Sequence, residues 1–339
     1  AGDRGLGIGK YPVSSHQSPI PCSQSLTPMP PLPVLIDCDT GVDDALALLL
    51  AARSPALKIL GVTCVAGNVP LHAVVPNTLT VLDAAQRAEI PVAAGYDRPL
   101  VALFESASHV HGDDGMGLPD WPRSTRQPDA RHAVDLMADI LIAAAEPVTL
   151  IALAPLTNLA GFVQRYPHLL PRIARIVSMG GSAFTGGNMT AAAEFNIGCD
   201  PEAAAVVYNS GVPITLYGLD VFRQVTLTEA EVASLENANQ PWSPLLGGLL
   251  RYIQRRFGQA EPGLGDGGTV AATILPDTLT THPHRVHIEL TGTHTRGMTV
   301  VDRRVASKDA RHAAPPNADV AYAIDARRCA ELFVETLVR

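Results

Sequence analysis

The sequence lacks the features of several classes of protein. Its five cysteines, spread over 339 residues, form no C-x-x-C pair and no spacing typical of a disulfide framework. Lysine and arginine total 25 against 33 acidic residues, and no basic run is present that would follow a phosphate backbone. We therefore expect no nucleic-acid partner, and the cysteine usage favours a reducing, cytoplasmic environment.

Long apolar segments are missing as well. The most apolar helical stretch, which follows Asp44, is broken by Arg53, Ser54 and Pro55 and is too short to cross a bilayer. We therefore expect no membrane partner. With 47% hydrophobic residues, the chain has enough apolar surface to build one large core.

Residues 1–32 differ in composition from the rest of the chain. They are rich in glycine, proline and serine, contain no apolar segment of a signal peptide, and run into "TPMPPLP". We interpret them as a tail that is disordered or artificially added. Residues 33–339 are then expected to form one folded domain.

Strand-like apolar runs alternate with helical patterns after this tail. The strand-like runs are "VLIDCD", "KILGVTCVAG", "IPVAAG", "VTLIALA", "RIVSMGG" and "PITLYGLD", and helices are expected at 45–52, 76–87, 132–145, from 156 and after 200. This alternation predicts an α/β fold with a single open, mostly parallel, Rossmann-like sheet covered by helices. The pattern turns helical from about residue 228 to 259. It then returns to the strand-like "RVHIELTG" and "GMTVVDRRV" and closes with a helix over 326–338.

Four aspartates, Asp37, Asp39, Asp43 and Asp44, are crowded between the first strand and the first helix. Two of them suit the first turn of the helix, where carboxylates cap backbone N–H groups and complement the dipole, and the other two could simply face water. Four carboxylates this close repel one another and raise each other's pKa. Because hard oxygen ligands on one turn fit calcium or magnesium, we favour a metal site.

Polar or glycine-rich residues also follow the other apolar runs. Examples are Asn68, Asn158, Gly180 and Asp220. Ligands of open α/β sheets bind outside the carboxyl ends of the strands, so these residues are candidates for one shared site.

Six segments carry a resemblance to a known family. They are "DCDTGVDDALAL" (37–48), "VTCVAGN" (62–68), "HGDDGMG" (111–117), "APLTNLA" (154–160), "MGGSAFTGGNMTAAAEFNIGCDPEAA" (179–204) and "GDGGTVAA" (265–272). In this order they resemble the nucleoside hydrolases of the inosine-uridine preferring type. The resemblance implies a catalytic domain over residues 33–339, with a helical insertion over the site, that hydrolyses ribonucleosides to ribose and free base.

The resemblance further implies a calcium cofactor and a ribose site. The implied calcium ligands are Asp39, Asp44, Asp266 and the carbonyl of Leu153. Asp43 would be the general base for a calcium-bound water that attacks C1′ through an oxocarbenium-like transition state. The implied ribose-binding residues are Asn188, Glu194 and Asn196, and Asn68 would support either Asp43 or the sugar hydroxyls. Phe195 lies in the same motif and either lines the sugar ring or packs in the interior.

The sequence departs from the family pattern on the side of the leaving base. Broad-range members carry a histidine directly before the late calcium aspartate, whereas this chain has Gly265. His111 matches the family's other base-side histidine and is the first catalytic candidate to protonate the base. Further candidates are Tyr252, Arg255 and Arg256, unless they form a solvated helix face, and Trp242, which would either stack on the base or cover the core.

Two alternatives remain open at this point. The string "DCDTG" superficially resembles haloacid dehalogenase-type phosphatases, but that class does not require the adjacent Asp43 and Asp44 or the "AEFN" motif. A nucleoside-binding or ribose-binding relative with weak or redirected activity is the stronger alternative, because the usual histidine is Gly265. The partner implied by the resemblance is a small nucleoside, and the implied assembly is a homodimer or homotetramer.

Overall fold

The computed structural model describes residues 30–304 and 314–339. Residues 1–29 of the predicted tail lie outside the described residues. The first strand begins at Leu32, one residue before the predicted start of the folded domain at residue 33. None of the helices in the described ranges has the length and apolar content needed to cross a membrane.

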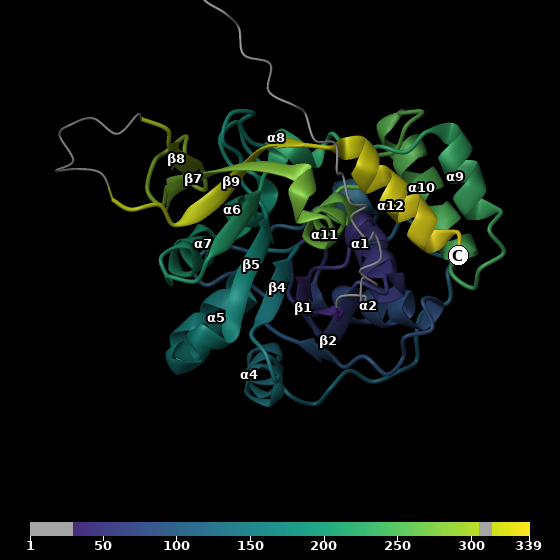
Figure 1. The fold of residues 1–339 in the computed structure, drawn as a ribbon, viewed down its shortest axis with the longest axis horizontal. Helices are drawn as coiled ribbons and strands as arrows, with labels where there is room; N and C mark the ends of the chain where they lie inside the picture. Colours follow the sequence, from purple (N-terminus) through teal and green to yellow (C-terminus); the bar gives the residue numbers. More distant parts are fainter. Residues whose placement is uncertain (1–29, 305–313) are drawn as a thin grey trace, which may run out of the picture. The chain divides into compact units, whose positions relative to one another are not determined.

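A nine-stranded sheet forms the centre of the fold, in the order β3-β2-β1-β4-β5-β6-β9-β7-β8 (Figure 1). The strands are β1 (Leu32–Cys38), β2 (Leu57–Cys64), β3 (Val92–Ala94), β4 (Val148–Ala152), β5 (Ile173–Met179), β6 (Ile214–Tyr217), β7 (Leu279–Ile288), β8 (Thr299–Asp302) and β9 (Ala318–Ile324). The pairs from β3 through to β9 are parallel, and β7 pairs antiparallel with both β9 and β8. This confirms the predicted α/β fold with an open, mostly parallel sheet.

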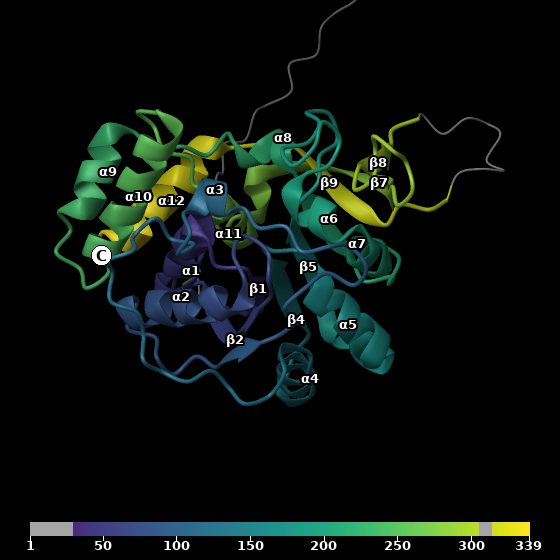
Figure 2. The same cartoon turned by 180° about the vertical axis from the view of Figure 1, so that it is seen from behind.

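Helices cover both faces of this sheet (Figures 1 and 2). They are α1 (Val42–Arg53), α2 (Leu71–Ala84), α3 (Ser108–His111), α4 (Ala133–Ala143), α5 (Thr157–Arg165), α6 (Phe195–Cys199), α7 (Pro201–Tyr208), α8 (Leu219–Phe222), α9 (Glu229–Glu236), α10 (Ser243–Phe257), α11 (Asp266–Ile274) and α12 (Ala326–Leu337). Two short 3₁₀ helices, η1 (Pro167–Arg172) and η2 (Pro276–Thr278), precede β5 and β7.

The two faces have separate apolar cores because side chains alternate along each strand. In β1, Val34 and Ile36 pack with α1, α2 and α10 to α12, whereas Leu35 packs with α4, α5 and α7. All three residues are fully buried. A strand that is buried on both sides reads as a continuous apolar run, which is the pattern that "VLI" has in the sequence.

The order of the strands reverses between β1 and β4. From β1 the chain winds outward through β2 to β3, then returns to β4 beside β1 and winds the other way through β5 and β6. A crevice opens at such a reversal, outside the carboxyl ends of the two central strands. The segment after β1 carries the crowded aspartates, and Leu153 directly follows β4.

Two elements differ from the sequence prediction. Strand β9 has the alanine-rich sequence "ADVAYAI" and was not predicted, although it lies inside the sheet between β6 and β7. Alanine has low strand propensity, so this strand depends on pairing with its two neighbours. Helix α2 spans Leu71–Ala84 rather than the predicted 76–87, and Pro76 lies inside it rather than at its start.

Helices α8, α9 and α10 lie between β6 and α11 in the chain and form the predicted helical insertion. Figure 2 shows α9 and α10 side by side, close to α3. Tyr252, Ile253 and Phe257 of α10 line the same cavity as the residues that follow β1 and β4. The insertion therefore covers the site, as expected.

Candidate active site

A cavity of about 590 Å³ lies at the reversal point of the sheet. Nine of the residues predicted from the sequence line it: Asp43, Asn68, His111, Leu153, Asn188, Glu194, Phe195, Asn196 and Asp266. Asp39 and Asp44, the remaining two, are fully buried next to it. The fold thus gathers residues that are up to 227 positions apart in the sequence, Asp39 and Asp266 being the outermost.

The start of α1 is organised around the Asp44 carboxylate. Its Oδ2 accepts a hydrogen bond from the Gly41 N–H at 2.9 Å, and its Oδ1 accepts one from the Asp39 N–H at 3.3 Å. The carboxylate therefore binds the backbone at the helix start, as expected for an acidic residue in the first turn. Gly41 itself has no room for a side chain, since a Cβ would lie 2.6 Å from His111 Nδ1.

Asn68 ties the two buried carboxylates together. Its N–H donates to Asp39 Oδ2 at 2.6 Å, and its side-chain amide donates to Asp39 Oδ1 at 3.1 Å and to Asp44 Oδ2 at 2.9 Å. The sequence prediction linked Asn68 to Asp43 or to the sugar, whereas its amide contacts Asp39 and Asp44 here. It fixes the orientation of the two carboxylates that the family resemblance assigns to the metal.

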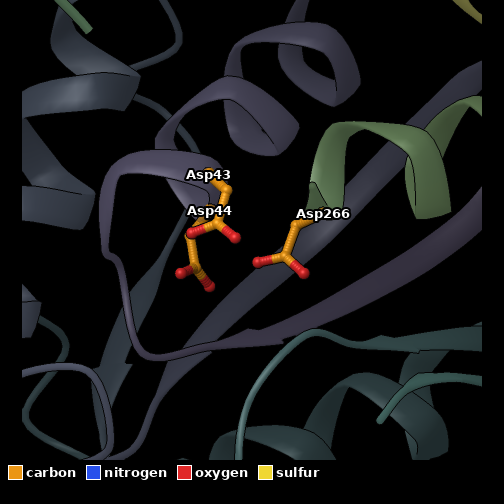
Figure 3. A group of neighbouring side chains, drawn as sticks. All are labelled: Asp43, Asp44 and Asp266. Atoms are coloured by element: carbon orange, nitrogen blue, oxygen red, sulfur yellow. The ribbon is translucent and has the colours of Figure 1, made fainter. Parts of the chain in front are cut away.

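Asp43, Asp44 and Asp266 form one compact acidic group (Figure 3). Asp43 and Asp44 extend from the first turn of α1 and Asp266 from the first residue of α11, and one carboxylate oxygen of each lies within 4.8 Å of the others. Asp44 and Asp266 are buried, while Asp43 is partly exposed to the cavity. Asp43 Oδ1 is buried without a hydrogen-bond partner in the described part of the chain.

Burial and mutual repulsion raise the pKa values of the three fully or nearly fully buried aspartates, Asp39, Asp44 and Asp266. Desolvation is the main cause for Asp39, Asp44 and Asp266, and charge on the neighbouring aspartates adds to it. The pKa of Asp44 rises to about 7, and those of Asp39 and Asp266 rise well above the usual value near 3.8. A cation held among these oxygens would remove the repulsion, so the donor set fits a hard divalent metal ion.

The fourth aspartate of the motif has a different environment. Asp37 is fully buried, and its Oδ1 accepts hydrogen bonds from Thr63 Oγ1 at 2.6 Å and from Asn158 Nδ2 at 2.8 Å. Asn158 also donates to the Cys64 carbonyl. Desolvation raises the pKa of Asp37 to about 7, against the effect of these hydrogen bonds. Asp37 therefore joins β1 to β2 and α5 and does not face water.

His111 is held against the start of α1. Its Nδ1 accepts a hydrogen bond from the Val42 N–H at 3.1 Å and lies 3.8 Å from Asp43 Oδ1. Burial lowers the pKa of the ring, although the Asp43 charge acts in the opposite direction. With Nδ1 as an acceptor, the neutral ring carries its proton on Nε2.

Backbone hydrogen bonds fix the residues of the "EFN" motif. Glu194 caps α6 through both carboxylate oxygens, which accept from the N–H groups of Asn196, Ile197 and Gly181. The Asn196 amide donates to the carbonyls of Leu153 at 2.8 Å and Met179 at 3.2 Å. It thereby connects α6 to the ends of β4 and β5.

The loop that ends at this motif is fixed in the same way. Asn188 Oδ1 accepts from the Phe195 N–H at 2.8 Å, and Phe195 is partly exposed on the cavity wall. Asp220, which follows β6, accepts from the N–H groups of Ala183, Phe184 and Thr185 and so holds the start of the loop. Both ends of the loop are therefore anchored next to the cavity.

Gly265 occupies a conformation that excludes other residues. Its φ is +53°, and a Cβ at this position would lie 2.7 Å from Asp43 Oδ2 and 3.1 Å from Phe222 Cζ. A histidine therefore does not fit this backbone, whose left-handed φ favours glycine. The position therefore has neither the histidine that the resemblance implies nor the space for one.

Three of the other base-side candidates have structural partners, and the fourth, Arg255, does not line the cavity. Trp242 is buried, donates from Nε1 to the Leu337 carbonyl at 2.9 Å and contacts the Arg53 guanidinium, so it covers the core. Tyr252 Oη donates to the Val110 carbonyl at 3.0 Å, and Arg256 Nε donates to the His109 carbonyl at 2.9 Å. These two side chains of α10 hold the helix that carries His111.

Several cavity residues were not predicted from the sequence. The main ones are Glu105, Phe222, Arg223, Thr226, Phe257 and Gln259. Most follow no strand and belong to no motif, so only their long-range neighbours bring them to the cavity. The helical insertion and the segment after β6 thus supply a wall that the sequence pattern does not reveal.

Comparison with known proteins agrees with this geometry. The family model described as inosine-uridine preferring nucleoside hydrolase matches residues 34–331. The pyrimidine-specific ribonucleoside hydrolase RihA of Salmonella paratyphi B is 38% identical over 311 residues, which cover 90% of this chain and 98% of the relative. The protein of the same name from Photobacterium profundum is 39% identical over 310 residues, with the same two coverages.

Solved structures show the same relationship. The purine-preferring ribonucleoside hydrolase from Gardnerella vaginalis superposes with a TM-score of 0.83 at 30% sequence identity, covering 90% of this chain and 98% of that one. The chain belongs to the inosine-uridine preferring nucleoside hydrolase family and is an N-glycosyl hydrolase.

Proposed function

We propose that this protein is a calcium-dependent ribonucleoside hydrolase, which converts a ribonucleoside and water to ribose and free base. The observation that carries the proposal is the acidic group of Asp43, Asp44 and Asp266, which opens into the cavity under the helical insertion. Family membership supports the reaction, and the chemistry of the oxygen donors supports the cofactor.

The proposed calcium ligands are those implied by the sequence: Asp39, Asp44, Asp266 and the Leu153 carbonyl. Their carboxylates are buried and their pKa values are raised, which is costly without a cation. When bound, calcium would neutralise the negative charge of these carboxylates and would bind two hydroxyl groups of the ribose. The Leu153 carbonyl already accepts one hydrogen bond from Asn196, which leaves its second lone pair for the metal.

Asp43 is the proposed general base. It is the member of the acidic group that is exposed to the cavity, and no described residue donates to its buried Oδ1. A water molecule beside this carboxylate would transfer a proton to Asp43 while the water oxygen forms a bond to C1′ of the sugar. The bond from C1′ to the base nitrogen breaks, and its electron pair leaves with the base through an oxocarbenium-like transition state.

The proposed ribose site is formed by Asn68, Asn188, Glu194 and Asn196. The Asp39 and Asp44 carboxylates hold the side chain of Asn68, and backbone groups hold the other three side chains, before substrate binds. This order reduces the entropy that binding must overcome. Glu194 Oε1 accepts only the Asn196 N–H among the described residues, so it has a lone pair left for a sugar hydroxyl. The Phe195 ring would form the apolar wall of the sugar pocket.

Pyrimidine ribonucleosides are the first substrates to test, because the two relatives named above are pyrimidine-specific. The panel is uridine, cytidine, inosine and adenosine beside p-nitrophenyl riboside, whose nitrophenolate leaves without a proton. Turnover of at least one natural nucleoside supports a working hydrolase. Binding of nucleosides without turnover, at saturating calcium, would instead favour the binding relative that the loss of the histidine at Gly265 suggests.

The predicted assembly and location remain proposals. We expect a homodimer or homotetramer in the cytoplasm, as the family resemblance and the cysteine usage imply. Light scattering during size-exclusion chromatography measures the first, and fractionation of cells measures the second.

A further inference from the structure

Few of the side chains predicted to contact the leaving base are free to donate a hydrogen bond or a proton to it. Gly265 has no side chain, and Tyr252 and Arg256 are engaged with the Val110 and His109 carbonyls. His111 uses Nδ1 to accept from the Val42 N–H, so the ring offers only a neutral Nε2–H. Another donor is needed to stabilise the charge that leaves with the base.

Arg223 lines the cavity and is not engaged elsewhere in the described residues. It directly follows α8, is exposed at the cavity wall, and its guanidinium makes no hydrogen bond or ion pair with another described side chain. Arg255, the neighbouring arginine of α10, does not line the cavity. Among the described residues, Arg223 is thus the arginine on this wall that has no side-chain partner.

The backbone places Arg223 beside the position of the missing histidine. The segment after α8 pairs antiparallel with the segment before α11: Leu227 N–H donates to the Pro262 carbonyl at 3.0 Å, and Leu264 N–H donates to the Val225 carbonyl at 2.9 Å. Thr226 is bridged to Gly263 between them. Arg223 lies just before the first strand of this ribbon, and Gly265 lies just after the second. Because the two strands are antiparallel, both residues lie at the same end of the ribbon.

Phe222 supports the same placement. Its Cζ lies 3.1 Å from the position that a Cβ on Gly265 would take, so the residue next to Arg223 touches the site of the missing side chain. The ring of Phe222 fills the space against Gly265, and Arg223 is a lining residue of the same cavity.

We propose that Arg223 is a catalytic residue that stabilises the departing base as an anion, in place of a proton donor at position 265. This inference rests on the proposed hydrolase function. As the C1′–N bond breaks, its electron pair spreads from the ring nitrogen onto a carbonyl oxygen of the base. The guanidinium donates N–H hydrogen bonds to that anion without losing its proton, because arginine stays protonated in proteins. The free base then takes a proton from water.

The test compares leaving groups in the full-length, calcium-loaded protein. Arg223→Ala and Arg223→Lys are assayed with uridine and with p-nitrophenyl riboside, and Arg255→Ala is the matched control for loss of one positive charge. Arg223→Ala should lower kcat/KM for uridine about 100- to 1000-fold, as expected for loss of a charge-stabilising donor. It should change kcat/KM for p-nitrophenyl riboside by less than about 5-fold, since nitrophenolate needs no such donor. Arg223→Lys should recover part of the uridine activity, and Arg255→Ala should match the wild type.

The possible results separate this inference from the proposed function. Equal loss of both activities in Arg223→Ala, or no loss of either, would overturn the role of Arg223 while the hydrolase function stands. If the wild type cleaves neither compound, the proposed function itself fails, and the inference fails with it. A uridine-specific loss that lysine partly restores supports both.

Discussion

The backbone of Gly265 lies against the carboxylate of Asp43, so that a Cβ on Gly265 would be 2.7 Å from both Cβ and Oδ2 of Asp43. Restoring the family histidine by Gly265→His should therefore reduce activity, because the new side chain displaces the proposed base and forces a left-handed φ on a non-glycine residue. We expect kcat for uridine to fall about 100-fold, the effect of a misplacement near 1 Å. Steady-state kinetics measure this, and a gain in kcat would show that the loop has room for the histidine.

Asp43→Asn removes the proposed base and keeps the size of the side chain. We expect kcat to fall by a factor of about 10² to 10⁴, the usual contribution of general-base catalysis. The melting temperature should change little, because Asp43 makes no hydrogen bond through its buried oxygen. Calcium binding by titration calorimetry is the control. An unchanged kcat in a folded, calcium-binding variant would refute the assignment.

Substrates that lack a ribose hydroxyl should react poorly. In the proposed site, calcium and the polar side chains bind the sugar hydroxyls, and a site built for a hydroxyl rejects the analogue without it. We expect kcat/KM for 2′-deoxyuridine to be at least about 100-fold below that for uridine. Parallel progress curves with the two nucleosides measure the ratio, and comparable values would rule out this mode of sugar recognition.

Removal of calcium should make stability depend on pH. The pKa of the proposed calcium ligand Asp44 is raised to about 7 in the folded chain, against about 3.8 when unfolded. An acid whose pKa is higher in the folded chain than in the unfolded chain stabilises the fold at pH values below its unfolded-state pKa. This contribution is lost as the pH rises through its folded-state pKa. The melting temperature of the metal-free protein should therefore fall between pH 5 and pH 7.

Calcium should reverse most of this loss. Because the cation favours the charged carboxylates, the calcium-loaded protein should melt at a higher temperature at pH 7 than the metal-free form, with a smaller difference at pH 5. Differential scanning fluorimetry at several pH values, with chelator or with added calcium, measures both effects. A calcium effect that is equal at pH 5 and pH 7 would argue against the buried acidic group as the metal site.

The fold was predictable to the extent that local pattern determines it. Runs such as "VLIDCD" are apolar because their strands are buried on both faces, and helical patterns between them imply the parallel sheet. Strand β9 was missed because its alanine-rich sequence has little intrinsic strand preference. Its place in the sheet comes from pairing with β6 and β7, which are at least 30 positions away from it in the sequence.

The cavity residues that follow β1 and β2 were predictable from the sequence, whereas those on the wall formed by the insertion and the segment after β6 mostly were not. Asp39, Asp43 and Asn68 follow the carboxyl ends of β1 and β2, where the topology of an open sheet concentrates ligand contacts. Arg223 belongs to no motif and reaches the cavity through the long-range pairing of Val225 with Leu264. The conformation of Gly265, which leaves no space for a side chain, likewise becomes apparent only in three dimensions.

The central claim is that calcium in the acidic group is required for hydrolysis of a ribonucleoside. The most direct test measures ribose released from uridine by wild-type protein that has been stripped with a chelator, before and after calcium is added back, with Asp43→Asn in parallel. We expect no release without calcium, full recovery on its addition, and no recovery in Asp43→Asn. Release that persists after complete removal of the metal, or no release with calcium present for uridine and the other nucleosides, would contradict the account.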